Sequence, residues 1–299
     1  MWGGRCRRPP RATARTSLAR MSPPRIGLFA IDTAITSREP LGRIGALCEE
    51  LGYDSVWMGE HVVLPDPRVP PSPMDPGDPI LDPLVALAYL AGHTERILLG
   101  TGLIILPQRN PLVLAKQAAS LDVLSGGRLI LGIGVGYLEP EMTAIGVPMR
   151  ARGARADEYL AAMRSLWDDD APAHHGEYVD FESVDAHPRP VQRPLPIVVG
   201  GHTEAAFRRA ARYADGWYGF LVGLRAMAQY RESLQRAQRD RPLHVSVSPS
   251  RRLDAETVGA YAELGVDRLI VIPPPGLSVD EVAEFVGSNA PERVGAAAA

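Results

Sequence analysis

The stretch GTGLIILPQRNPLVLAKQAASLDVLSGGRLILGIGVGY, residues 100–137, contains most of a strand–helix–strand unit. Ile97–Leu106 is an apolar run that predicts a buried strand. Apolar residues then recur at helical spacing, and the glycine pair 126–127 predicts the end of that helix. Leu129–Val135 is the next apolar run. Because both strands are apolar on both faces and a helix joins them, we expect them to lie parallel in a covered sheet.

The same alternation continues in both directions from this unit. We expect eight strands, at Ile26–Ile31, Val56–Met58, Ile97–Leu106, Leu129–Val135, Ile197–Val199, Gly216–Leu221, Leu243–Val247 and Arg268–Ile272. Each is followed by a helical pattern, so the chain predicts an α/β fold, a (β/α)8 TIM barrel, as one domain over residues 25–290. A doubly wound open sheet is the alternative, but the sequence marks no topological switch point.

Two connections are long and rich in proline. One is Val62–Pro79, after the second strand, and the other is Asp168–Pro196, in the connection that follows the fourth strand. Loops that follow strands lie on the catalytic face of a barrel. We therefore interpret Val62–Pro79 as a candidate lid, with a rigid surface excursion as the alternative. A short hairpin is expected around Glu177–Phe181.

The composition narrows the class of protein. The chain has 299 residues, of which 45% are hydrophobic, and a formal net charge of −3, so no basic surface indicates binding to nucleic acid. No apolar run is long enough to span a bilayer. Cys6 lies in a polar leader and Cys48 in a helical pattern, so we expect no disulfide and a cytoplasmic protein.

The two ends of the chain differ from the rest. Residues 1–24 hold six arginines and no acidic residue. We expect a disordered extension there, or a start codon assigned too early with Met21 as the true start. A targeting peptide is the alternative, but no apolar segment follows Arg7 and Arg8. We expect residues 291–299 to form a disordered tail.

The second strand runs into an acid and an imidazole, Glu60 and His61. In a barrel these side chains lie at the carboxyl end of the strand, where such enzymes place their chemistry. A histidine exchanges a proton near neutral pH, since its unperturbed pKa is about 6.5. We predict that His61 is a general acid or base; the alternative is a histidine that hydrogen-bonds a loop carbonyl. No histidine spacing builds a zinc site, so no metal is expected.

Two glycine-rich segments are candidate ligand contacts. Gly134 and Gly136 end the fourth strand and leave no Cβ in the way of a ligand, whereas Gly132 is better explained by tight packing. The second segment follows an apolar strand, opens a helix and consists of Gly200, Gly201, His202 and Thr203. Such a junction directs free N–H groups and the helix dipole at an anion, although an ordinary glycine-rich turn is the alternative.

Five blocks of the sequence, taken together and in this order, form a recognisable pattern. The blocks are GEH at 59–61, GTGLIILPQRNP at 100–111, LAKQAASLDVLSGGRLILGIGVGY at 114–137, RGARADEYL at 152–160 and PIVVGGHTEAAFRRAARYADGW at 196–217. Together they cover most of residues 25–290. They resemble the luciferase-like superfamily of flavin and deazaflavin enzymes, and in particular the branch that uses coenzyme F420, a deazaflavin.

The resemblance implies a role for each candidate residue. In the family, the histidine after strand two lies beside the deazaflavin ring, which matches His61, and the acid before it lines the same pocket, which matches Glu60. A non-proline cis peptide in a bulge of the third strand matches Gly102–Leu103. The glycines that end strand four, with Tyr137, then face the cofactor, and the turn at 200–203 holds its phosphate.

The resemblance implies an F420-dependent oxidoreductase that transfers a hydride between the deazaflavin and a small organic substrate. It also implies a homodimer. An FMN-dependent monooxygenase of the same fold and a non-catalytic deazaflavin-binding protein are the alternatives. Arg109 is a further candidate, for the acidic tail of a deazaflavin. Sugar-phosphate dehydrogenases of the family have a glutamate at the position of Tyr137, so this tyrosine argues against a sugar-phosphate substrate.

Overall fold

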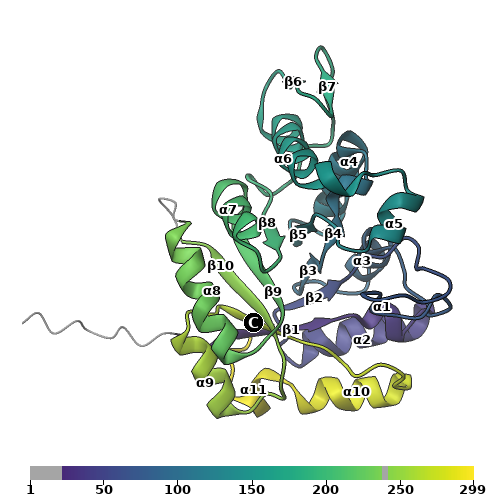
Figure 1. Ribbon diagram of the computed structural model, residues 1–299. Helices are drawn as coiled ribbons and strands as arrows, with labels where there is room; N and C mark the ends of the chain where they lie inside the picture. The colour runs from purple at the N-terminus through teal and green to yellow at the C-terminus, as the bar shows by residue number, and fades with distance from the viewer. Residues whose placement is uncertain (1–21, 238–241) are drawn as a thin grey trace, which may run out of the picture.

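The computed structural model describes residues 22–237 and 242–299. The main sheet has the order β3-β2-β1-β11-β10-β9-β8-β5-β4, and β3 also pairs with β5, so the sheet closes into a barrel (Figure 1). Its segments are β1 (Arg25–Phe29), β2 (Ser55–Met58), β3 (Leu98–Thr101), β4 (Ile104–Ile105), β5 (Leu129–Gly134), β8 (Ile197–Gly200), β9 (Gly216–Val222), β10 (His244–Pro249) and β11 (Arg268–Val271). The expected third strand is interrupted and forms β3 and β4, which leaves eight barrel strands and confirms the predicted (β/α)8 fold.

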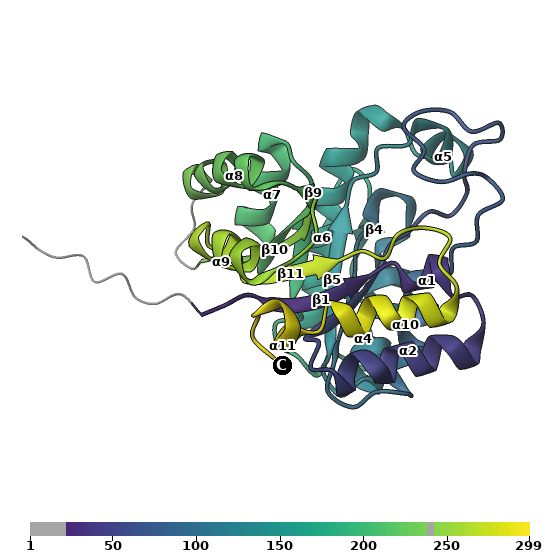
Figure 2. The same cartoon turned by 90° about the horizontal axis from the view of Figure 1, so that it is seen from below.

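Helices surround the barrel, and the view from below shows α2 and α10 side by side against it (Figure 2). The helices are α1 (Ile31–Ala34), α2 (Arg38–Glu50), α3 (Pro83–Ala91), α4 (Pro111–Leu124), α5 (Glu139–Ala144), α6 (Arg152–Asp168), α7 (Glu204–Tyr213), α8 (Leu224–Arg236), α9 (Ala255–Glu263), α10 (Val279–Ser288) and α11 (Pro291–Val294), with 3-10 turns η1 (Leu106–Gln108) and η2 (Met149–Ala151). The starts of α3 and α4 follow from the sequence. Asp82 and Asn110 each accept two backbone N–H groups, and a proline fills the next position.

Aromatic side chains fill the inside of the barrel. Trp57 of β2 stacks on Tyr218 of β9, with ring centroids 5.8 Å apart, and Phe29 of β1 lies 6.4 Å from Tyr218. The strands fit closely around them. A Cβ on Gly132 would lie 2.0 Å from the Thr101 carbonyl oxygen, so Gly132 is a packing residue, as predicted.

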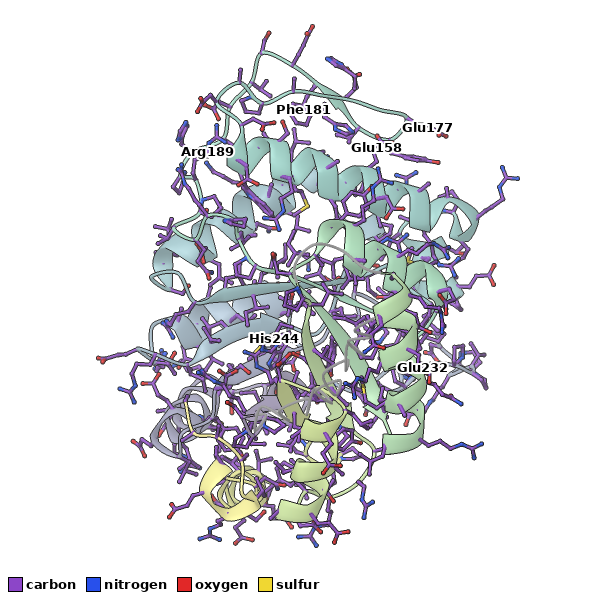
Figure 3. The ribbon with its side chains drawn as sticks, turned by 90° about the vertical axis from the view of Figure 1, so that its left-hand side faces the viewer. Glu158, Glu177, Phe181, Arg189, Glu232 and His244 are labelled. Atoms are coloured by element: carbon purple, nitrogen blue, oxygen red, sulfur yellow. The ribbon has the colours of Figure 1, made fainter. Side chains whose placement is uncertain are left out.

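An ion pair closes the amino end of the barrel. Arg268 of β11 donates to Asp54, and Arg25 donates to the same carboxylate at 3.1 Å. Burial alone raises the pKa of Asp54, but the two arginines outweigh it and hold that pKa below its ordinary value. Burial and the charge of Arg268 lower the pKa of His244, at the start of β10, to about 4 (Figure 3).

The connection 168–196 joins α6 to β8 and therefore starts from a helix. Gln192 donates to Asp122, at the end of α4, and to the carbonyl of Leu129, at the start of β5. The part of the connection around Gln192 thus packs near the amino ends of the strands. Of the two long connections, only 62–79 follows a strand rather than a helix. The expected hairpin is present as β6 (His174–His175) and β7 (Asp180–Phe181).

Glu158 of α6 holds this hairpin in place (Figure 3). Its carboxylate accepts the backbone N–H groups of Glu177, Tyr178 and Val179 at 3.1, 2.7 and 2.8 Å. These bonds satisfy three donors in a segment that lacks regular structure.

The expected disordered tail over residues 291–299 is wrong. Pro291 and Val294 of α11 are buried, and the backbone N–H of Ala297 donates to Pro24 at 3.1 Å. The N–H of Ala299 also donates to Gly52, so the end of the chain packs beside β1. In the expected extension 1–24, residues 1–21 lie outside the described residues. No described helix is both long enough and apolar enough to cross a membrane.

Candidate active site

His61 lies just beyond β2 at the carboxyl end of the barrel and is held by a buried carboxylate. Its Nδ1 lies 2.8 Å from Oε2 of Glu141, in the first turn of α5. The other oxygen of Glu141 accepts the backbone N–H of Val62 at 2.6 Å. An ionised Glu141 can only accept, so Nδ1 carries the hydrogen in this pair. Glu141 therefore fixes the orientation of the imidazole.

The second nitrogen of His61 faces Tyr137. The Tyr137 hydroxyl lies 3.4 Å from Nε2, and the two rings meet edge to face with centroids 5.9 Å apart. Tyr137 is half exposed, so this side of the imidazole is the side next to solvent. Burial and the nearby charge of Glu141 raise the pKa of Tyr137 above its ordinary value, so its hydroxyl stays protonated near neutral pH. Nε2 is thus the nitrogen available for proton exchange.

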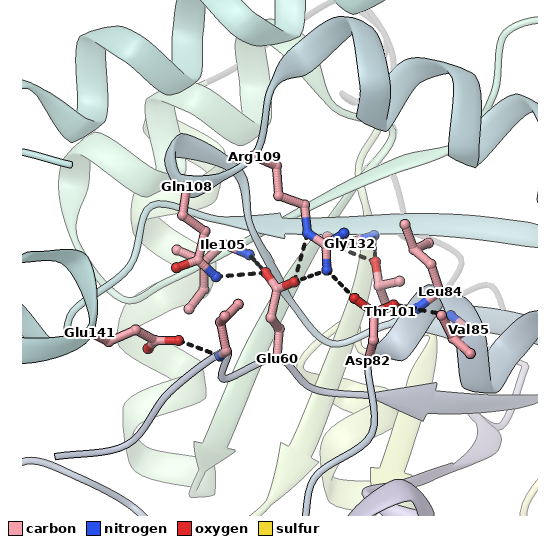
Figure 4. A network of polar contacts seen from close by, with 11 residues as sticks. Glu60, Asp82, Leu84, Val85, Thr101, Ile105, Gln108, Arg109, Gly132 and Glu141 are labelled. Carbon is pink, nitrogen blue, oxygen red and sulfur yellow. Dashed lines mark hydrogen bonds and ion pairs between the residues drawn. The ribbon is translucent and has the colours of Figure 1, made fainter. Parts of the chain in front are cut away.

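Glu60 lies beside His61 but is engaged elsewhere (Figure 4). Its carboxylate accepts the backbone N–H of Ile105 at 2.6 Å and the side-chain amide of Gln108 at 3.1 Å. Arg109 binds the same carboxylate through two nitrogens and also reaches Asp82 at 2.6 Å. Burial opposes the charge of Arg109, but the two carboxylates outweigh it and raise the pKa of Arg109.

This network changes the interpretation of two sequence candidates. Among the described residues, the polar contacts of Glu60 reach Ile105 of β4, Gln108 of η1 and Arg109, and they hold this segment against the end of β2. These contacts support a positioning role for Glu60, and its contact with a cofactor stays a prediction from the resemblance. Arg109 is committed to Glu60 and Asp82, and this geometry does not direct it at an acidic tail.

The Gly102–Leu103 peptide between β3 and β4 is cis, as the resemblance implies. The Leu103 side chain lies against glycines of two neighbouring strands. A Cβ on Gly134 would lie 3.2 Å from Leu103, and one on Gly200 would lie 2.1 Å from it. These two glycines therefore make room for Leu103, rather than leaving room only for a ligand. Gly136 has φ +79°, and a Cβ there would lie 2.9 Å from Ile105.

The turn 200–203 forms the junction between β8 and α7 that the sequence predicts. Gly201 has φ +121°, and the Thr203 hydroxyl caps α7 by accepting the N–H of Ala206 at 3.3 Å. The His202 ring stacks on Tyr230 of α8 with centroids 5.2 Å apart. Gly201, His202 and Thr203 are exposed, so a ligand has access to this helix start.

Asp32 is a further acidic group at this end of the barrel. It lies on α1, directly after β1, and is fully buried. Among the described residues, neither carboxyl oxygen has a hydrogen-bond partner, and burial raises the pKa of Asp32 to about 8. At neutral pH the side chain is therefore mostly the neutral acid, a form that donates a hydrogen bond.

Sequence reasoning missed Asp32 and the contact of Glu141 with His61. Both acids lie on helices that directly follow barrel strands or their loops, and this position is the one signal that could have marked them. The pairing of Glu141 with His61 joins residues 80 positions apart, and no spacing in the sequence indicates it.

We expect replacement of Glu141 by glutamine to lower kcat by roughly 10–10³-fold. The amide keeps the size of the side chain but can donate to Nδ1, which favours the wrong tautomer of His61. Steady-state kinetics should show the loss in kcat, with an unchanged dissociation constant for the cofactor and an unchanged Tm. Glu141→Asp should recover part of the rate. A lower Tm with an unchanged kcat would contradict a positioning role.

We expect Asp32 to make the free energy of unfolding depend on pH. Because its folded pKa lies above the unfolded value of about 3.9, its contribution is complete below pH 4 and is lost as the pH rises toward 8. Between pH 5 and pH 7 the wild type should therefore lose about 2–3 kcal/mol relative to Asp32→Asn. Urea unfolding of both proteins at pH 5, 6 and 7 measures this difference. The same change of the free energy of unfolding with pH in both proteins would refute the prediction.

The sequence and the fold agree with a known family. The family model described as luciferase-like monooxygenase matches residues 23–262. This chain belongs to that family. An uncharacterized protein of Mycobacterium tuberculosis is 32% identical over 270 residues, which cover 87% of this chain and 94% of that protein.

Two relatives have named activities. F420-dependent glucose-6-phosphate dehydrogenase from Kineococcus radiotolerans is 35% identical over 196 residues, 64% of this chain and 55% of that protein. The oxygenase component of flavin-dependent trigonelline monooxygenase from Acinetobacter baylyi is 33% identical over 149 residues, 49% of this chain and 38% of that protein. The family thus includes oxidoreductases that depend on F420 and oxidoreductases that depend on a flavin.

A solved structure shares the fold. The coenzyme F420-dependent tetrahydromethanopterin reductase from Methanopyrus kandleri superposes with a TM-score of 0.73. The match covers 90% of this chain and 99% of that chain at 14% identity, so it concerns the fold alone.

Proposed function

We propose that this chain is an F420-dependent oxidoreductase that transfers a hydride between the deazaflavin and a small organic substrate. A bound deazaflavin supplies the hydride chemistry at its central ring carbon. His61 exchanges the accompanying proton with the substrate through Nε2. The observation that carries the proposal is the His61–Glu141 pair, which occupies Nδ1 and leaves Nε2 facing the half-exposed Tyr137 hydroxyl at the carboxyl end of β2.

The residues at the carboxyl end of the barrel fit a deazaflavin in three respects. The cis Gly102–Leu103 peptide lies between the ends of β2 and β5, at the position where the family resemblance would put it against the ring. The exposed turn at 200–203 opens α7 and suits a phosphate. Asp32, as a neutral acid without a partner among the described residues, suits a carbonyl oxygen. We further propose a homodimer and a cytoplasmic location, on the family resemblance and the cysteine usage.

An FMN-dependent monooxygenase is the second candidate, and the trigonelline monooxygenase relative favours it. A non-catalytic deazaflavin-binding protein is a third possibility. The buried support of His61 by Glu141 argues against it, because a binding protein has no need of an oriented imidazole.

An assay with reduced cofactor separates the three candidates. Reduced F420 is mixed with the protein and a panel of carbonyl compounds and activated alkenes without oxygen, and the return of the oxidised chromophore is followed. We expect acceptor-dependent oxidation. Oxidation that requires O₂ and FMN would favour the monooxygenase, and no oxidation under any condition would favour the binding protein. His61→Ala serves as the inactive control.

A further inference from the structure

The end of β9 holds two exposed apolar side chains in an otherwise buried strand. Residues 216–219 and Val222 are buried, whereas Phe220 is 43% exposed and Leu221 is 54% exposed. Buried parallel strands of a barrel place alternate side chains inside and outside, so two exposed neighbours need a local cause.

The cause is one extra residue in β9. Val247 of β10 pairs with Gly219, but Pro249 pairs with Val222, so Phe220 and Leu221 together lie opposite Ser248 alone. This is a β-bulge, a device that redirects side chains and that recurs next to active sites. Leu221 has φ +52°, a left-handed conformation that non-glycine residues rarely adopt and that clusters at functional sites. The bulge thus turns both side chains out of the regular pattern.

Ring contacts place Phe220 over the open end of the barrel. Phe220 lies 6.5 Å from Tyr218, which fills the barrel interior, and 5.6 Å from Phe29. The Phe29 ring in turn lies against Gly102, where a Cβ would come within 2.6 Å of it. Phe220 therefore lies one ring away from Gly102 of the cis peptide.

The apolar pair and the proton-exchanging group lie on opposite sides of the barrel. In the closed order of the eight barrel strands, β9 is the fourth strand from β2 in either direction. A substrate whose reacting oxygen meets Nε2 of His61 therefore extends its other end toward β9. Charged side chains at the ends of β2 and β3/β4, Glu60 and Arg109, are already paired with each other.

We propose that Phe220 and Leu221, the β9 wall, form the substrate-binding wall, and that the substrate is an uncharged compound with a hydrocarbon body. This rests on the proposed function, because that function places the reacting atom at His61. Burial of a hydrocarbon chain against the wall supplies affinity in proportion to its length.

A homologous series of ligands tests the wall. The deazaflavin-loaded protein is titrated calorimetrically with 2-butanone, 2-pentanone, 2-hexanone and 2-heptanone, and with glucose 6-phosphate. We expect the Kd of the ketones to fall about two- to fourfold per added methylene, and no binding of glucose 6-phosphate. A Kd that is independent of chain length, or preferential binding of the sugar phosphate, would overturn the proposal.

Three variants test whether the dependence of the ketone Kd on chain length comes from the β9 wall. In Phe220→Ser and Leu221→Ser, the Kd of the ketones should depend less on chain length, with a change per methylene close to onefold. Leu124 is an exposed leucine at the end of α4, and Leu124→Ser should show the same dependence on chain length as the wild type. Both wall residues are exposed, so the variants should fold. Deazaflavin is titrated into each protein. Loss of deazaflavin binding in Phe220→Ser alone would make the wall a cofactor contact and overturn the proposal. Absence of deazaflavin binding in the wild type would instead refute the proposed function, and the ketone series on the unloaded protein would still test the wall.

Discussion

Replacement of His61 by alanine is expected to lower kcat by about 10²–10⁴-fold. The variant removes the group that exchanges the substrate proton and leaves Glu141 without its imidazole partner. The hydride chemistry belongs to the cofactor, and the cis peptide and the turn at 200–203 do not depend on His61. The Kd of deazaflavin should therefore change little. Steady-state kinetics and a fluorescence titration of the same preparation measure both quantities.

A matched control is His187→Ala. This histidine lies in the connection 168–196, and its exposed imidazole lies 3.0 Å from the carboxylate of nearby Asp185. It should keep the wild-type kcat. Turnover of His61→Ala at the wild-type rate would remove His61 from the mechanism.

Replacement of Arg109 by methionine is expected to lower the free energy of unfolding by about 3–5 kcal/mol. Glu60 would keep its buried carboxylate and its bonds to Ile105 and Gln108 but lose its cationic partner. An unpaired buried charge costs far more than a pair contributes. Because Glu60 directly precedes His61, kcat should fall as well. Urea unfolding measures the loss, since the midpoint and the slope of the transition together give the free energy of unfolding.

Two comparisons make this prediction specific. Arg43→Met breaks an exposed pair with Asp280, 3.4 Å apart, and should change stability by less than about 1 kcal/mol. The double variant Glu60→Gln, Arg109→Met removes both charges and should recover much of the loss. A double variant with a lower free energy of unfolding than Arg109→Met would show that the effects of the two substitutions add, and would contradict the pairing of Glu60 with Arg109.

The sequence predicts the barrel because the fold depends on local patterns. Buried strands such as Leu129–Gly134 are apolar on both faces, and helices such as Pro83–Ala91 and Pro111–Leu124 start at a capping residue followed by proline. The bend inside the third strand came only from the family resemblance, since apolar residues continue through it. The packed end of the chain was missed because residues 291–299 are rich in alanine, lack large apolar side chains and lie at a terminus, as in a disordered tail.

The site was predicted only in part, for a physical reason. His61 was identifiable because a strand end fixes its place in a barrel. Its partner Glu141 depends on how α5 packs beside β2, which is a tertiary contact without a periodic signal. For the same reason the sequence did not indicate that Glu60 pairs with Arg109 and also accepts from Ile105 and Gln108. The bulge in β9 is likewise visible only in the pairing with β10.

The measurement that tests the central claim most directly is a pair of binding titrations on the full chain. Oxidised F420 and, separately, FMN are titrated into the protein, and their fluorescence is followed. The proposal predicts tight binding of the deazaflavin and weak binding of FMN. Tight binding of FMN with weak binding of F420 would contradict it and assign the barrel to the flavin monooxygenases of the same family.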